Sequence, residues 1–176
     1  MSPRVLCAGI GNVFFSDDGF GVAVADRLKR MSVPDGVVVE DYGIRGVHLA
    51  YELLDGYDAL VLIDTLPPGD EPPGTVVVFE PDSTPTEAGG DVAPAMDAHT
   101  MTPVAVLTTL ASLGGSVERV VVVGCRPATI EGGMGLSEPV AGAIDRAVET
   151  VIELLIELVG NRPTDVCQPA GRESRT

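Results

Sequence analysis

Two aspartates follow predicted strands at positions where a parallel sheet presents functional groups. Asp18 lies in a loop after the apolar run at 4–10, and Asp64 ends the apolar run at 58–64. In a doubly wound sheet with the strand order 2-1-3, the carboxyl ends of the first and third strands flank the place where such sheets bind ligands. We therefore expect both carboxylates to face one crevice, where they would attract a cation.

His99 supplies a third potential metal ligand. It lies near the end of a long acidic segment, 81–101, just before a predicted helix that Thr102 would cap, with Pro103 in the first turn. The positive end of a helix disfavours the imidazolium form, so the His99 ring should stay neutral and able to bind metal. One imidazole with two carboxylates matches a site for a divalent transition ion with open coordination positions.

Each candidate also has a purely structural interpretation. Ser16 or Asp17 would cap the helix predicted at 18–31, and the second carboxylate would favour its positive end. Asp64 alone would be a turn or capping aspartate. His48, the other histidine of the chain, is expected on a helix face without a role. The combination of three such groups at one edge of the sheet favours a site.

A fourth candidate is Asp41, the first residue of the segment Asp-Tyr-Gly-Ile-Arg-Gly at 41–46. The two glycines suit a tight turn from strand to helix, which would place Asp41 on the same edge of the sheet as Asp18.

The loop after the first predicted strand does not match a dinucleotide site. Gly9 and Gly11 have the right spacing, but Phe14 stands where the fingerprint requires a third glycine. The carboxylates of Asp17 and Asp18 would also repel a pyrophosphate. NAD and FAD are therefore disfavoured, and the sequence holds no HExxH, GxSxG or P-loop motif.

Short β-branched runs alternate with helical patterns, which is typical of an α/β domain. The patterns predict strands near 4–10, 36–41, 58–64, 75–80 and 119–124, and helices near 18–31, 46–55, 102–113 and 138–159. The proline-rich linker 65–74 is too short for a helical crossover, so the strand at 75–80 should be antiparallel. We expect one doubly wound, three-layer domain over 1–160, with a mostly parallel five-stranded sheet, and a disordered tail over 161–176.

The chain has 176 residues, with 11 basic and 26 acidic side chains and a net charge of −15. Nucleic acids and anionic membranes attract basic proteins, so both are disfavoured as partners. No apolar run approaches the roughly 18 residues that span a bilayer, and no signal-peptide pattern opens the sequence, which predicts a cytoplasmic protein. Three cysteines without a CxxC pair argue against a disulfide framework or a cysteine zinc site.

Taken together, these segments resemble the hydrogenase maturation endopeptidases, which remove a C-terminal extension from the large subunit of [NiFe] hydrogenases. The resemblance extends from about residue 4 to residue 159 and rests on Gly9-Ile-Gly-Asn12, Ser16-Asp-Asp-Gly-Phe-Gly21, Asp41-Tyr-Gly-Ile-Arg-Gly46, Leu62-Ile-Asp64 and Ala98-His99. It implies that Asp18, Asp64 and His99 bind a metal. The first ligand position of this family holds glutamate or aspartate, and this chain has the shorter residue, Asp18. Tyr42 stands at a position of the family that is often glycine.

The resemblance further implies that the metal is nickel, presented by the large-subunit precursor, although other divalent transition ions could occupy the site. The metal would polarise the scissile carbonyl or activate a water, with an unbound carboxylate, Asp18 or Asp41, taking the proton, or it would serve recognition alone. We expect a monomer. The alternatives are a non-enzymatic metal-sensing or nucleotide-binding α/β module and a peptidase related to the spore germination proteases.

Overall fold

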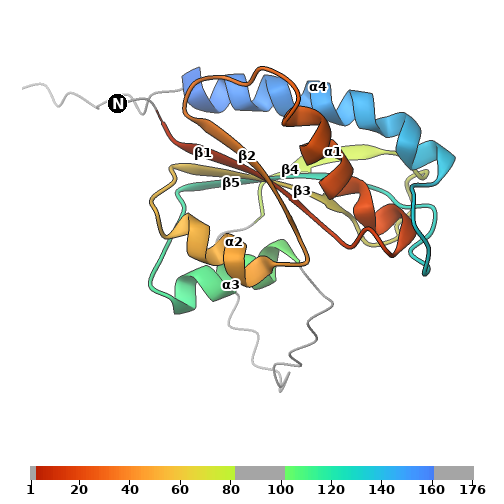
Figure 1. Ribbon diagram of the computed structural model, residues 1–176, viewed down its shortest axis with the longest axis horizontal. Coiled ribbons are helices and arrows are strands. Elements are labelled where there is room, and N and C mark those ends of the chain that lie inside the picture. The colour runs from red at the N-terminus through yellow and green to blue at the C-terminus, as the bar shows by residue number, and fades with distance from the viewer. Residues whose placement is uncertain (1–2, 82–101, 161–176) are drawn as a thin grey trace, which may run out of the picture.

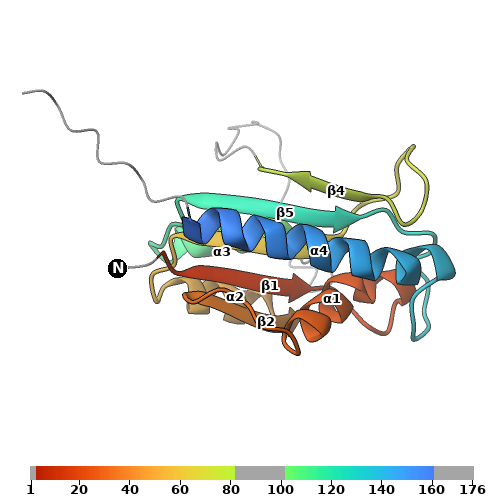
Figure 2. The same cartoon turned by 90° about the horizontal axis from the view of Figure 1, so that it is seen from above.

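Five strands form a single sheet in the order β2-β1-β3-β5-β4. In chain order they are β1 (Val5–Ile10), β2 (Val37–Gly43), β3 (Ala59–Thr65), β4 (Val76–Phe79) and β5 (Arg119–Cys125). β1 pairs in parallel with β2 and β3, and β3 pairs in parallel with β5, whereas β4 runs antiparallel to β5 at the end of the sheet (Figure 2). The computed structural model describes residues 3–81 and 102–160.

Helices cover both faces of this sheet (Figure 1). α1 (Phe20–Leu28) and α4 (Glu138–Gly160) lie on one face, and α2 (Gly46–Leu53) and α3 (Pro103–Ser112) lie on the other. A short 3-10 helix, η1 (Ser16–Gly19), precedes α1. The α/β class, the three layers and the mostly parallel sheet with one antiparallel strand are therefore as predicted. The boundary at 160 stays a prediction, because the structure describes no residue beyond it.

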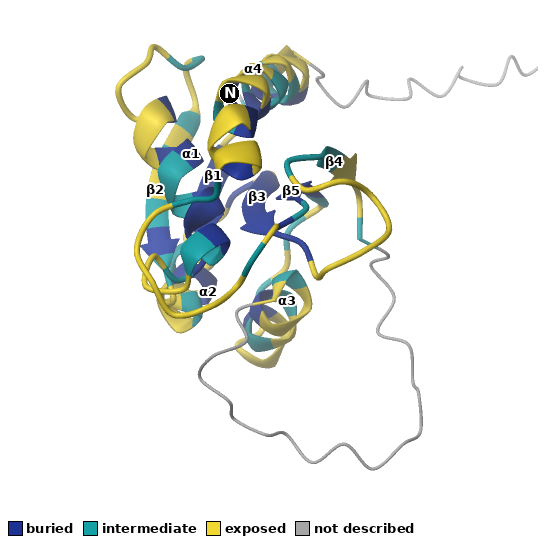
Figure 3. Ribbon diagram, turned by 90° about the vertical axis from the view of Figure 1, so that its right-hand side faces the viewer, coloured by how far each residue is buried: buried dark blue, intermediate teal, exposed yellow. Residues whose placement is uncertain are grey.

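The central strands are apolar on both sides because both sides are covered. In β3, Val61 and Ile63 pack toward α1 and α4, whereas Leu60 and Leu62 pack toward α2 and α3. All four side chains are fully buried, each contributing roughly 1.5–3 kcal/mol of hydrophobic free energy. Figure 3 shows these buried strands between helices whose outer surfaces are exposed. This core holds the carboxyl ends of β1 and β3 in a fixed place.

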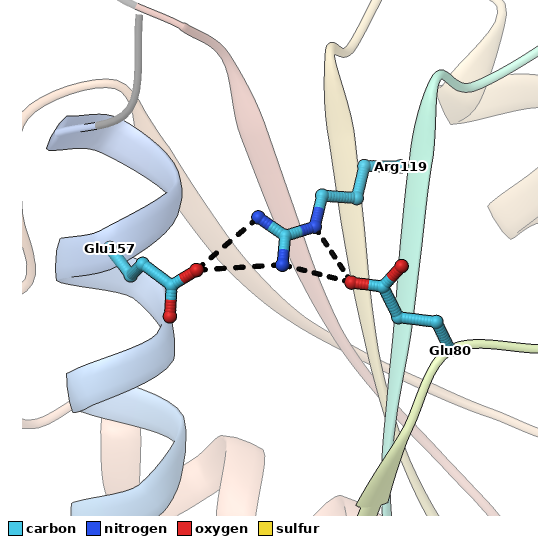
Figure 4. Close-up of polar contacts among 3 residues, drawn as sticks. All are labelled: Glu80, Arg119 and Glu157. Carbon is cyan, nitrogen blue, oxygen red and sulfur yellow. Dashed lines mark hydrogen bonds and ion pairs between the residues drawn. The ribbon is translucent and has the colours of Figure 1, made fainter.

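An ion-pair cluster joins the edge of the sheet to α4 (Figure 4). Arg119, the first residue of β5, lies 2.8 Å from Glu80 and 3.5 Å from Glu157 of α4. Because these side chains are partly exposed, the pairs contribute modestly to stability. They fix the edge of the sheet near β4 against the long helix.

Two predictions about local structure have opposite outcomes. The cap of α3 is confirmed, since Thr102 Oγ1 accepts a 3.2 Å hydrogen bond from Ala105 N with proline in the first turn. The cap predicted at Ser16 or Asp17 is wrong: neither side chain caps η1 or α1, and α1 begins only at Phe20. Ser16, the first residue of η1, has a φ of +49°, outside the range of a right-handed helix.

Cys7 and Cys125 are buried, as expected of small apolar side chains. Burial raises the pKa of the Cys7 thiol to about 12 and that of Cys125 to about 11. In the part of the chain that the structure describes, no helix is long and apolar enough to cross a membrane.

Candidate active site

Glycines allow the start of α1 to lie directly against the strand ends. A Cβ at Gly21 would stand 2.1 Å from the carbonyl oxygen of Ile63 and 2.3 Å from that of Ile10. A Cβ at Gly11, where φ is +132°, would stand 1.9 Å from the carbonyl oxygen of Asp18. Close packing of α1 on the strands therefore depends on Gly21. In a dinucleotide fingerprint, the glycine that permits this packing would stand at the position of Phe14. This packing brings η1 over the carboxyl ends of β1 and β3.

Asp17 is a buried structural carboxylate, and the sequence analysis missed this role. Its side chain accepts hydrogen bonds from the backbone N–H groups of Ala128 (2.8 Å), Thr129 (3.0 Å) and Ser137 (2.6 Å), and from Ser137 Oγ (2.9 Å). Burial by itself would raise the pKa of Asp17, but these hydrogen bonds hold it below the usual value. Asp17 thus fixes η1 to the segment between β5 and α4.

Asp18 and Asp64 line one cavity of about 330 Å³ at the carboxyl ends of the strands. Asp18 Oδ2 accepts a 2.9 Å hydrogen bond from Asn12 N, and Asp64 Oδ1 accepts a 2.7 Å bond from Thr65 N. Thr65 Oγ1 also donates to the carbonyl of Asp17 at 2.6 Å, which ties β3 to η1. The structure therefore brings the two predicted carboxylates together, as the strand order indicated.

The Asp64 carboxylate is in an unfavourable environment for a negative charge. Asp64 is only 8% exposed. Burial raises the pKa of Asp64 well above its usual value, and the negative charge of Asp18 raises it further, whereas the N–H of Thr65 partly opposes this. A cation in the cavity would relieve both effects. The donor chemistry and the electrostatics of the pair therefore fit a divalent metal ion.

The third predicted ligand, His99, lies outside the described residues, as does the acidic segment 82–101. The chain becomes described again at Thr102, which lines the same cavity together with Pro103. Within residues 3–81 and 102–160, no three His, Cys, Asp or Glu side chains gather as a metal site. The participation of His99 therefore stays a prediction. His48 is exposed on α2, as expected.

Asp41 lies in a different cavity from Asp18 and Asp64. It lines a cavity of about 390 Å³ that also includes Ser16, Asp26 of α1 and Leu136. Asp41 Oδ1 is buried and, among the described residues, has no hydrogen-bond partner. The predicted shared edge of the sheet therefore does not place all three aspartates in one cavity.

The sequence and the fold were compared with those of known proteins. The family model described as "Hydrogenase maturation protease" matches residues 22–154. The chain belongs to this family. The hydrogenase expression/formation protein HupD of Rhizobium leguminosarum bv. viciae is 35% identical over 156 residues, which are 88% of this maturation protease and 75% of HupD.

Two solved structures show that the fold is shared as well. The hydrogenase maturating endopeptidase HybD from Escherichia coli is 27% identical with a TM-score of 0.72, covering 88% of this chain and 93% of HybD. The [NiFe] hydrogenase maturation protease HybD from Thermococcus kodakarensis is 26% identical with a TM-score of 0.65, covering 86% and 99%. The family match agrees with a peptidase and does not support the alternative of a nucleotide-binding module.

The cavity of the maturation protease has mostly apolar walls around its two carboxylates. These walls include Ile44 after β2, Phe79 at the end of β4, Val104 in the first turn of α3 and Ile130 after β5, and each of these side chains is at least 40% exposed. These apolar walls were not predictable from the sequence, because the residues that form them are far apart in the chain. Apolar walls weaken the screening of charge and would accommodate an apolar stretch of a peptide chain.

Proposed function

We propose that this protease removes the C-terminal extension of a [NiFe] hydrogenase large-subunit precursor after nickel has been inserted. The observation that carries the proposal is the position of Asp18 and Asp64 in one cavity at the carboxyl ends of β1 and β3. The family match supports the same reaction class. A cavity with an open mouth suits a peptide segment of a large partner better than an enclosed site would.

Nickel enters the proposal as part of the substrate. Asp18, Asp64 and His99 would contact an ion that the precursor already holds. Two or three protein ligands bind a free ion weakly but complete the coordination of an ion that arrives with other ligands. The unfavourable burial of the Asp64 charge supports this role, because the ion would offset it only when the loaded precursor is present. Cleavage would then follow nickel insertion.

We assign the proton transfer that hydrolysis needs to Asp18, through a carboxylate oxygen that does not contact the ion, rather than to Asp41. Both were candidates from the sequence, but Asp18 shares the cavity with Asp64, whereas Asp41 lines the other cavity. Asp18 is also less buried than Asp64. A bound metal ion would supply polarisation of a carbonyl or a water. The cytoplasmic location and the monomeric state expected from the sequence stay predictions.

The test is the intact mass of a purified large-subunit precursor after incubation with the protease, with and without nickel loading. We expect loss of a C-terminal peptide only from the loaded precursor. Asp18→Asn, Asp64→Asn and His99→Ala should each abolish this loss. His48→Ala and Asp145→Asn change an exposed histidine and an exposed α4 carboxylate, and should cleave like the wild type.

Three other outcomes are informative. Cleavage without nickel would keep the peptidase and remove metal recognition as its trigger. Full activity of His99→Ala would remove this histidine from the site. No cleavage of any loaded precursor, together with tight binding of free nickel, would favour the metal-sensing module instead.

A further inference from the structure

Exposed apolar side chains gather on two segments beside the proposed active site. Residues 12–16, after β1, carry Phe14 at 62% exposure, and residues 129–135, after β5, carry Met134 at 76%. Val13, Phe15 and Ile130 on the same segments are 36%, 43% and 42% exposed. We call these five side chains the apolar rim. Apolar side chains that are exposed together, rather than singly, commonly mark a site of interaction with another molecule.

Hydrogen bonds join the two backbone segments that carry the rim. Ser16 N donates a 2.8 Å hydrogen bond to the carbonyl of Gly133, and Gly133 N donates a 2.9 Å bond to the carbonyl of Phe14. Ser16 Oγ donates to the carbonyl of Glu131 at 2.9 Å. The buried carboxylate of Asp17 adds its hydrogen bonds to the backbone of the second segment. The two segments therefore behave as one unit, although more than 100 residues separate them.

Holding the rim in place costs conformational energy. Ser16 is in the left-handed region at φ +49°, which is unfavourable for a residue other than glycine. Rigid presentation of apolar side chains reduces the entropy lost when they bind a partner. The combination of backbone strain, fixed hydrogen bonds and exposed apolar groups is typical of a preorganised docking surface.

The rim is continuous with the cavity that holds the two carboxylates. Ile130 belongs to the rim and also lines the cavity with Asp18 and Asp64. A partner seated on the rim would therefore lie at the mouth of the proposed active site. Glu131 is the charged side chain between Ala128 and Ser137, and the segment 11–16 has none. In a chain of net charge −15, this surface suits an apolar partner and not a basic one.

We propose that the apolar rim docks an apolar patch on the folded large-subunit precursor, with Phe14 and Met134 as its anchors. This inference rests on the proposed function, because it takes the substrate protein as the partner. It adds a binding surface outside the cavity, so that recognition depends on the body of the precursor as well as on its nickel and its cleaved segment.

The test compares binding and cleavage by rim variants. The affinity of the purified nickel-loaded precursor is measured with Asp64→Asn protease, so that no product forms. In this background the double variant Phe14→Ser/Met134→Ser should weaken binding at least tenfold. With Asp64 restored, the same pair should lower kcat/KM by a similar factor, mainly through KM. Phe14→Leu, which keeps an apolar group, should retain most of the affinity.

The matched control is Ile156→Ser. Ile156 is 57% exposed and lies near the end of α4, on the side of the molecule where β1 starts (Figure 1). The cavity lies at the opposite, carboxyl ends of β1 and β3. It should change affinity and kcat/KM less than twofold. Circular dichroism of each variant checks that the fold is intact, which we expect because the rim side chains make none of the hydrogen bonds described.

Four outcomes decide between the explanations. Unchanged affinity of Phe14→Ser/Met134→Ser would overturn the inference. An equal loss in Ile156→Ser would also overturn it, because the effect would then be a general one. A wild-type dimer that the rim variant dissociates, with unchanged precursor affinity, would assign the rim to a second copy of this chain. If the wild type binds the precursor through the rim but does not cleave it, the docking surface is supported and the proposed proteolysis is overturned.

Discussion

Thr65 Oγ1 donates a 2.6 Å hydrogen bond to the backbone carbonyl of Asp17. This bond joins Thr65, the last residue of β3, to η1. Asp64 precedes Thr65 in the chain and Asp18 follows Asp17, so the bond fixes the spacing between the two carboxylates. Thr65 and Asp17 therefore position the neighbouring carboxylates of Asp64 and Asp18. Thr65 does so through this bond, and Asp17 also accepts the hydrogen bonds from the segment between β5 and α4.

Thr65→Val should disturb this spacing while preserving the shape of the side chain. The carbonyl of Asp17 would lose its donor in a buried place, which costs about 1–3 kcal/mol of unfolding free energy. Processing of the nickel-loaded precursor should fall more than stability would explain, because Asp18 is displaced. Thr65→Ser keeps the hydroxyl and should recover the processing rate. Urea unfolding and precursor cleavage measure the two effects, and a fully active Thr65→Val protein would contradict the positioning role.

Asp17→Ala should be strongly destabilising. It removes the acceptor of three backbone N–H groups and of the Ser137 hydroxyl, at a residue with 0% exposure. We expect a loss of about 3 kcal/mol or more in the free energy of unfolding. Asp26→Ala, on the exposed face of α1, is the control and should cost less than about 1 kcal/mol. A small effect at Asp17 would mean that water replaces the lost acceptor.

The same carboxylate should contribute to acid sensitivity. Burial raises the pKa of Asp17, but the hydrogen bonds prevail and the folded-state pKa lies below the usual value of 3.8. A carboxylate with a lowered pKa stabilises the fold above its unfolded-state pKa, and this contribution is lost as the pH falls through the folded-state pKa. Unfolding measured between pH 7 and pH 2 should show a shallower acid loss in Asp17→Asn than in the wild type.

Asp64→Asn should stabilise the metal-free protein while abolishing cleavage. Burial and the Asp18 charge raise the Asp64 pKa well above the usual 3.8, so ionised Asp64 destabilises the fold. For a raised carboxyl pKa, the native state binds the extra proton, and stability falls as the pH rises from the unfolded-state pKa to the folded-state pKa. The gain from Asp64→Asn should therefore be absent near pH 3 and grow toward neutral pH. Thermal unfolding across this range measures it, and a less stable variant at pH 7 would contradict the argument.

Gly21→Ala tests the close packing of α1 on the strand ends. Its Cβ would lie 2.1 Å from the carbonyl oxygen of Ile63, so backbone must move. We expect a loss of about 2 kcal/mol or more in unfolding free energy and a large loss of processing. Gly142→Ala on α4 is the matched control, because its Cβ meets nothing within 4 Å. That variant should be more stable by about 0.4–1 kcal/mol, since alanine favours helix. Equal effects at the two glycines would refute the packing argument.

The fold was largely predictable because strand and helix periods are local properties. Apolar runs such as that of β3 and the proline-rich linker before β4 determine burial and direction within a few residues. Asp18 and Asp64 were found for a related reason, since the ends of parallel strands meet at one edge whatever the side chains.

Asp17 shows what could not be predicted. It was interpreted as a helix cap because aspartate at a helix start commonly caps it, but its partners are 111 to 120 residues away in the sequence. Asp41 shows the same limit in another form. Residues on the same edge can line different cavities, and which one they line depends on side-chain direction, here in a strand packed against α1.

The bond between Asp17 and Ser137 also has a consequence for biosynthesis. It closes a contact across 120 residues, and pairings so far apart in the sequence are slow to form. A chain synthesised only as far as β5 would lack this contact, although it would keep the Thr65 bond to η1. The full set of hydrogen bonds that places η1 beside β3 would therefore form only after Ser137, the residue before α4, has been synthesised, so that a truncated chain would hold Asp18 less firmly.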